Sequence, residues 1–220
     1  MNRKISKFFL LTTMIFGLAV LISLELQEIN QICPESSDTQ SDSSDILDQE
    51  VMDELIYFPI GREREPATYR IDFVDSWNWE RTFGGNRKHE GCDLMQTPSE
   101  RGVLPVISMT DGVIENIGWL KLGGYRIGIR SESQTYYYYA HMNDYSPDIY
   151  EGKTVAAGEL LGFVGDSGYS NIEGTVGMFP VHLHIGIYRP NTLGEDVAIN
   201  PYPYMELLKE DTYLISLKKE

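Results

Sequence analysis

The stretch Val181–Tyr188, VHLHIGIY, places two histidines two positions apart in a run of otherwise apolar residues. The chain of 220 residues has only four histidines, so half of them lie here. Side chains of a strand point alternately to opposite faces, which would put His182 and His184 on one face and Leu183 and Ile185 on the other. The stretch therefore predicts a strand with an apolar core face and a second face that carries two imidazoles.

The same strand-like pattern continues through the sequence from about Tyr57 onward. Apolar runs there are short, rich in β-branched and aromatic residues, and separated by Gly, Asp, Asn and Ser. The runs lie at residues 103–109, 112–120, 125–131, 135–142, 160–165 and 182–188. Such spacing is typical of an all-β domain, so we expect a mainly β fold built on an antiparallel sheet. A short helix is expected only near the C-terminal end, over Pro203–Lys209.

The N-terminal segment, residues 1–25, has the character of a membrane-targeting sequence. Arg3, Lys4 and Lys7 precede an uncharged apolar run, Phe8–Leu24, whose length suits a short membrane span or a long signal-peptide core. The small residues that signal peptidase needs do not follow it. We expect a single hydrophobic helix that remains as a signal-anchor in the cell membrane, with the folded domain outside the cytoplasm. The alternative is a cleaved signal peptide and a secreted domain.

Residues 26–55 carry many acidic residues and no Lys or Arg, and they account for much of the net charge of −15. Their Ser/Asp-rich composition predicts a disordered linker, with an acidic docking tail as the alternative. An acidic chain without basic stripes is a poor partner for nucleic acid. We therefore expect a folded domain over 56–205 and a tail over 206–220. Cys33 and Cys92 are too unevenly placed to predict a disulfide framework.

The remaining two histidines lie in clusters of their own. His89 and Asp93 are four apart in RKHEGCDL, where neighbouring glycines favour a loop in which an imidazole and a carboxylate can converge. A surface histidine beside a surface aspartate is the alternative. His141 ends the strand-like run TYYYYAHM, where alternation predicts that Tyr137, Tyr139 and His141 share one face. There the alternative is a hydrogen-bonded histidine in a core strand, and we expect the two tyrosines to be packing residues.

Two imidazoles on one strand face would repel each other if both were charged, and each needs a partner if buried. A metal ion meets both needs, because neutral imidazole is a common metal ligand. Taken together, the clusters supply four histidines and a carboxylate that could converge. Two histidines and one aspartate suit a catalytic Zn²⁺ with an open fourth position, which leaves two histidines for proton transfer.

Three motifs in this order, HEGCD, YYYYAHM and HLHIGIY, resemble the HxGxD, Tyr-x-His and HxH elements of the lysostaphin/LytM-type zinc endopeptidases. The resemblance covers about residues 75–205. It implies a duplicated hybrid motif fold, a barrel-sandwich hybrid with a zinc-binding groove. It also implies one Zn²⁺ per chain and a catalytic pair beside it. The implied metal ligands are His89, Asp93 and His184, and the implied catalytic pair is His141 and His182.

The activity implied by this resemblance is zinc-dependent hydrolysis of peptide bonds in bacterial peptidoglycan, in cross-links or stem peptides, by a monomeric enzyme. A metal-activated water would attack, and one histidine would act as general base. Residues 168–180 depart from the family pattern, since many relatives have a short turn there; we expect this longer segment to form one wall of the groove. The alternatives are a non-catalytic peptidoglycan-binding or scaffold protein of the same fold, and a histidine phosphocarrier, which the N-terminal anchor disfavours.

Overall fold

The computed structural model describes residues 47–61, 68–83 and 85–210. The predicted N-terminal helix, residues 1–25, and residues 26–46 of the predicted linker lie outside these ranges. Within them, no helix is both long enough and apolar enough to cross a membrane.

The described part of the chain is built on one ten-stranded sheet and a separate two-stranded hairpin. The path through the large sheet is β1-β4-β11-β8-β7-β6-β9; β10 pairs with β5 and β8, and β12 pairs with β11. The strands are β1 (Arg70–Asp72), β2 (Glu80–Arg81), β3 (Arg87–Lys88), β4 (Cys92–Thr97), β5 (Pro105–Ile107), β6 (Gly112–Leu120), β7 (Gly124–Arg130), β8 (Tyr136–Tyr145), β9 (Thr154–Val155), β10 (Leu160–Val164), β11 (His182–Pro190) and β12 (Asp196–Ile199). The strands of the sheet pair antiparallel, as predicted from the short apolar runs.

Strand β11 lies inside the sheet, where it pairs with β4, β8 and β12. Leu183 and Ile185 are completely buried, which confirms the predicted core face of this strand. On the other face, His184 lies opposite Asp93 of β4 and Ala140 of β8. The register of β11 therefore decides which side chains from three strands meet.

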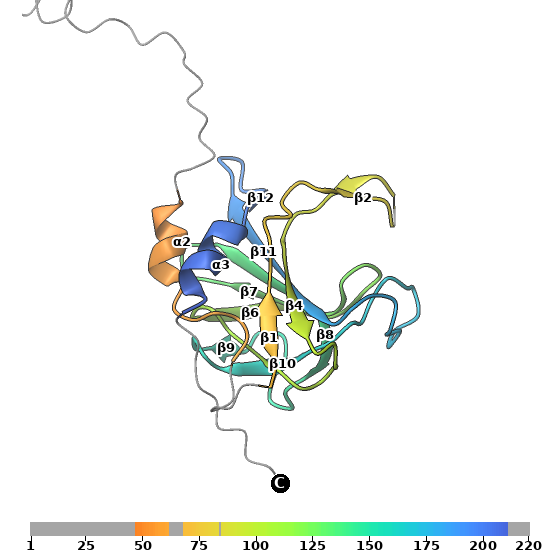
Figure 1. Cartoon of the computed structure of the whole chain (residues 1–220). Helices are drawn as coiled ribbons and strands as arrows, with labels where there is room; N and C mark the ends of the chain where they lie inside the picture. Colours follow the sequence, from red (N-terminus) through yellow and green to blue (C-terminus); the bar gives the residue numbers. More distant parts are fainter. Residues whose placement is uncertain (1–46, 62–67, 84, 211–220) are drawn as a thin grey trace, which may run out of the picture. The chain divides into compact units, whose positions relative to one another are not determined.

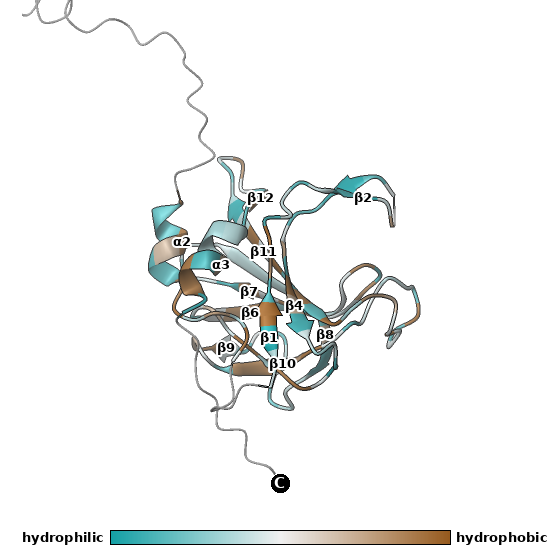
Figure 2. Ribbon diagram, viewed as in Figure 1, coloured by the Kyte–Doolittle hydropathy of each residue, from teal (hydrophilic) through white to brown (hydrophobic). Residues whose placement is uncertain are grey.

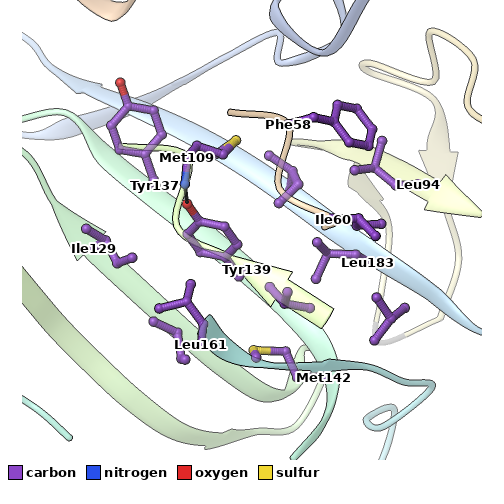
Figure 3. Close-up of a cluster of buried hydrophobic side chains, with 14 of the residues drawn as sticks. Phe58, Ile60, Leu94, Met109, Ile129, Tyr137, Tyr139, Met142, Leu161 and Leu183 are labelled. Carbon is purple, nitrogen blue, oxygen red and sulfur yellow. Dashed lines mark hydrogen bonds between the residues drawn. The ribbon is translucent and has the colours of Figure 1, made fainter. Parts of the chain in front are cut away.

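The core is a continuous apolar cluster behind the sheet (Figure 3). Tyr137 and Tyr139 of β8 are fully buried in it, which confirms that they are packing residues. The Tyr139 hydroxyl accepts the backbone N–H of Met109 at 2.9 Å, so its polar atom is satisfied inside the core. Hydrophobic residues lie mainly on the strands of the large sheet, whereas β2 is hydrophilic (Figure 2).

The folded domain begins before residue 56, because a short helix, α2 (Gln49–Glu54), precedes it. The Asp48 side chain caps this helix by accepting the backbone N–H groups of Glu50 and Val51. Val51 is completely buried, and Leu47 and Leu55 pack against the same core. The prediction of a disordered linker is wrong for residues 47–55, because helix α2 buries Val51 and the flanking Leu47 and Leu55 pack, partly buried, against the core.

Arg189 at the end of β11 attaches helix α2 to the sheet. Its guanidinium donates to the carboxylates of Asp48 and Glu50 on the helix side. It also donates to the hydroxyls of Ser133 at 3.0 Å and Thr135 at 2.8 Å in the loop before β8. One side chain thus joins α2, β11 and the β7–β8 loop.

A second helix, α3 (Tyr202–Leu208), confirms the expected C-terminal helix. Figure 1 shows it beside α2, and the Tyr204 hydroxyl accepts the backbone N–H of Asp48 at 2.9 Å. Leu208 is buried. The predicted boundary at residue 205 is therefore too early, since the domain includes the whole of α3.

We predict that Val51→Ala lowers the free energy of unfolding by roughly 1–3 kcal/mol, because it leaves a cavity in the core. The matched control is Asp53→Ala on the exposed face of the same helix, which should change the free energy of unfolding by less than about 0.5 kcal/mol. Urea denaturation of both variants measures the difference. Superimposable curves for Val51→Ala and the wild type would show that α2 is not part of the cooperative fold.

Candidate active site

Three donor atoms converge where β4 and β11 meet. Asp93 lies on β4 directly opposite His184 on β11, and His89 lies in the connection just before β4. The Asp93 Oδ1 atom is 2.9 Å from His184 Nδ1 and 3.1 Å from His89 Nε2. The two ring nitrogens are themselves 3.1 Å apart. The structure thus brings together all three predicted metal ligands, although Asp93 lies on a strand and not in the loop predicted for this motif.

The contacts of His89 Nδ1 determine whether the Nε2 atom that faces the site carries a proton. His89 Nδ1 lies 3.1 Å from the backbone oxygen of Ser76 and 3.0 Å from the Ser76 hydroxyl. A carbonyl oxygen can only accept, so Nδ1 carries the proton and the lone pair of Nε2 points at the Asp93 carboxylate. Lone pairs at this separation repel one another unless a cation lies between them.

This donor set fits a zinc ion. In a tetrahedral site with bonds of about 2.0–2.1 Å, neighbouring ligand atoms lie about 3.3 Å apart, which is close to the spacing found here. The Arg81 guanidinium donates to Asp93 Oδ2 at 2.7 Å, and a neighbouring cation favours the charged form of a carboxyl group. The carboxylate is therefore ionised, as a metal ligand must be.

Arg81 is a site residue that the sequence analysis missed. Its Nη2 atom donates to Asp93 Oδ2 at 2.7 Å, so the carboxylate is held through the oxygen that does not face the histidines. Arg81 ends β2, and it reaches Asp93 because β2 and β3 form a hairpin. Nothing in the local sequence marks this arginine, since the contact depends on the path of the hairpin.

Gly91 allows the His184 ring to lie against the backbone between His89 and Asp93. A Cβ atom at Gly91 would be 2.3 Å from His184 Cε1 and 2.7 Å from the backbone oxygen of Ile185. Both separations are far below van der Waals contact. This glycine is therefore required by the close approach of the imidazole.

The two histidines predicted to transfer protons lie beside the donor cluster. His141 Nδ1 is 2.8 Å from the backbone oxygen of Ser167, and His182 Nδ1 is 2.8 Å from that of Pro180. Each Nδ1 is therefore the protonated nitrogen, and Nε2 is the atom that can accept a proton. The ring centres of His141 and His182 are 4.8 Å apart, and His182 Nε2 lies 3.8 Å from Asp93 Oδ1.

Both of these histidines are nearly inaccessible to solvent, and this affects their protonation. Burial lowers the pKa of His141 well below its ordinary value, and any positive charge on the neighbouring His182 or His184 would lower it further. Burial also lowers the pKa of His182, although the nearby Asp93 carboxylate opposes the shift. Both imidazoles are therefore neutral near pH 7, the state in which a general base works.

His141 reaches this site through a β-bulge, which corrects the predicted face of β8. Between the pairs Ile127–Tyr139 and Tyr125–Met142, strand β8 has one more residue than β7. His141 has φ +63°, a left-handed conformation that histidine adopts more readily than most residues. The prediction that it shares a face with Tyr137 and Tyr139 is wrong, because the bulge turns its side chain away from the core.

The donor cluster and the neighbouring His141 and His182 open into one cavity of about 850 Å³. From the segment 168–180, which is expected to form one wall of the groove, only Tyr169 is among the residues that line the cavity. Phe179 packs against His141 with ring centres 4.6 Å apart, and Tyr169 lines the cavity. Phe83, between β2 and β3, stacks on Tyr169 with ring centres 4.3 Å apart, so the hairpin contacts the segment 168–180 beside the cavity.

Known proteins are similar to this chain in sequence. The model of Peptidase family M23 matches residues 87–201, a region that contains all five predicted site residues. The L-Ala–D-Glu endopeptidase of Bacillus subtilis (strain 168) is 40% identical over 159 residues, which are 71% of this chain and 47% of the relative. The glycyl-glycine endopeptidase ALE-1 of Staphylococcus capitis is 28% identical over 125 residues, which are 56% of this chain and 30% of the relative. This chain thus spans less than half the length of either curated relative.

A solved structure is also similar. It is the crystal structure of a protein of Ruminococcus gnavus ATCC 29149, described as a candidate glycyl-glycine endopeptidase lytM. It is 45% identical, with a TM-score of 0.68 over 74% of this chain and 64% of the other. The match to the family model covers more than half of the chain and includes the metal donors and both neighbouring histidines. The chain belongs to Peptidase family M23.

Proposed function

We propose that this protein hydrolyses peptide bonds of bacterial peptidoglycan, in cross-links or stem peptides, with one zinc ion per chain. The observation that carries the proposal is the convergence of three potential ligand atoms, from His89, Asp93 and His184, beside two neutral imidazoles. The names of the family relatives, which are endopeptidases, support the same reaction.

The protein residues provide what a hydrolytic step needs around the metal. When bound, zinc lowers the pKa of water and polarises a carbonyl group. His141 and His182 present Nε2 toward the site because backbone oxygens hold their Nδ1–H groups. One of them would accept a proton from the attacking water at Nε2 and pass that proton to the leaving amine. The other would lie beside the developing oxyanion, to which it could donate a hydrogen bond only in its protonated form. Arg81 keeps the Asp93 carboxylate in place throughout.

A non-catalytic binding or scaffold role would need no proton-transfer groups. The described residues keep the three donors and both imidazoles within one cavity, and no observation favours the scaffold role over hydrolysis. We also propose that residues 1–25 anchor the protein in the cell membrane, with its catalytic domain outside the cytoplasm. The basic residues followed by an apolar run support this.

Substitutions of the two β11 histidines test the proposed division of roles. We predict that His184→Ala loses both zinc and activity, because it removes a ligand. His182→Ala should keep close to one zinc per chain but lose activity by a factor of about 10² or more, since only proton transfer is affected. Metal analysis of the purified proteins and release of soluble fragments from cell walls measure the two properties.

Two results would contradict these assignments. Wall digestion by His182→Ala at the wild-type rate would show that His182 does not transfer a proton. Wild-type protein that holds stoichiometric zinc but cuts no wall preparation would support the scaffold role.

A substitution outside the ligand set tests the packing under the metal site. Gly91→Ala places a methyl group against the His184 ring and the Ile185 carbonyl. We predict a loss of zinc affinity of at least about 10–100-fold, the range for changes that misplace a ligand. The control is Glu90→Ala, the exposed neighbour, which should bind zinc like the wild type. Competition with a fluorescent chelator measures affinity, and unchanged binding by Gly91→Ala would show that His184 does not need this backbone approach.

A further inference from the structure

The cavity extends from the metal donors across the sheet to a group of tyrosines around Arg126. Cross-strand pairing places Gly186 opposite Tyr138 and Tyr188 opposite Tyr136. These positions lie on the face of the sheet that carries His184. Arg126 of β7 lines the same cavity, next to Tyr136 and Tyr138. The floor beyond the metal donors is thus aromatic, with one guanidinium set into it.

Glycines allow these tyrosine rings to lie flat on the sheet. A Cβ atom at Gly128 would be 1.8 Å from the Tyr136 hydroxyl, and one at Gly123 would be 2.2 Å from the Tyr138 hydroxyl. Each ring therefore occupies the space above a glycine. The phenolic oxygens remain near the floor, and the volume above them belongs to the cavity.

Arg126 is a cation in this floor with two unpaired donor atoms. Among the described residues, its Nε and Nη1 atoms are buried and have no hydrogen-bond partner. Arg130, four positions along the same strand, is different, because its guanidinium pairs with Glu115 at 2.6 Å and with Asp196 at 2.8 Å. Buried donors of a charged group are costly to leave unpaired, so a ligand that supplies hydrogen-bond acceptors next to Arg126 would bind favourably.

The other charges in the cavity do not neutralise Arg126. Three carboxylates line the cavity: Asp93 faces the metal site, Asp196 is paired with Arg130, and Glu90 is exposed. The unpaired Nε atom of Arg87 is also buried in the described structure, and this arginine lies close enough to Tyr188 to influence its pKa. This part of the groove is therefore positive, although the chain as a whole is strongly acidic.

The surrounding phenols add neutral hydrogen-bond donors. Burial raises the pKa of Tyr138, and it raises the pKa of Tyr188 to about 12. Both hydroxyls keep their protons at neutral pH. A carboxylate accepts hydrogen bonds and donates none, so it is complementary to a guanidinium fork beside O–H groups.

We propose that Arg126 anchors a subsite for a carboxylate carried by an acidic residue next to the scissile bond. The inference rests on the proposed peptidase function and narrows its substrate class. The relatives' names point to two kinds of bond, alanyl–glutamyl and glycyl–glycyl. A glycine bridge has no side-chain charge and would leave Arg126 buried without an acceptor. The subsite therefore favours a stem peptide with a glutamyl residue whose carboxylate is not amidated.

Paired peptides that differ only in this carboxylate test the subsite in the zinc-loaded full chain. In both peptides the carbonyl of L-Ala is joined to the amino group of D-Glu, and the γ-carboxyl of D-Glu is joined to the next residue. The α-carboxyl of D-Glu is either ionised or converted to its amide, and both peptides end in a C-terminal amide. This removes the chain end as a second source of carboxylate. We expect the wild type to have a kcat/KM about 10–100-fold higher for the acidic peptide, the effect of one hydrogen-bonded charge pair.

Arg126→Gln should remove this preference by slowing the acidic peptide about 10–100-fold, with the amidated peptide changed less than about threefold. Lys121→Gln is the matched control, because it removes an exposed positive charge from the same cavity and should keep the preference. Arg126→Lys, which keeps the charge, should restore part of it. Equal rates for the two peptides in the wild type, or equal slowing of both in Arg126→Gln, would overturn the subsite.

Binding to zinc-loaded His182→Ala separates this inference from the proposed function. In one outcome, the wild type does not cut the acidic peptide, but the acidic peptide binds at least tenfold more tightly than its amide. If this difference in binding also disappears without Arg126, the subsite stands and the peptidase function fails. If both peptides are cut at the same rate, the function stands and the subsite fails. If neither is cut and both bind equally, both proposals fail.

Discussion

The register between β4 and β11, which sets His184 opposite Asp93, is the constraint on which the site depends. Side chains directly opposite on neighbouring antiparallel strands have Cβ atoms about 4.5–5.5 Å apart, so the register alone brings two donors into reach. A slip of one residue would move Leu183 and Ile185 to the groove and the histidines to the core. Burying those two side chains, worth roughly 1.5–3 kcal/mol each, therefore also holds the metal ligands in place.

Main-chain oxygens, and not charged side chains, orient the other imidazoles. His89, His141 and His182 each present Nδ1 to a backbone carbonyl at 2.8–3.1 Å. A carbonyl cannot titrate, so these contacts keep the same tautomer over the pH range in which the fold is stable. The oxygens belong to segments on both sides of the groove, and correct folding of both walls is a condition for a complete site.

Much of this could be predicted from the sequence, because alternation and motif order are local properties. The strands follow from alternation, and the choice of His89, Asp93 and His184 was implied by the resemblance of three motifs to a known family. The side of β8 that carries His141 does not, because a single inserted residue reverses the alternation and no residue type requires a bulge there. Arg81 was missed because its contact depends on the hairpin path. Helix α2 was hidden because the acidic composition around it outweighed three apolar residues at helical spacing.

The net charge of the chain does not show where its unpaired charges lie. Net charge is a sum over all residues, whereas a binding site responds to charge that has no partner nearby. Arg126 and Arg130 lie on one strand in the sequence RIGIR and would be judged equivalent from sequence. Only Arg130 is within reach of Glu115 on β6 and Asp196 on β12. The arrangement of neighbouring strands, not the residue type, therefore decides which of the two arginines stabilises the fold and which can receive a ligand.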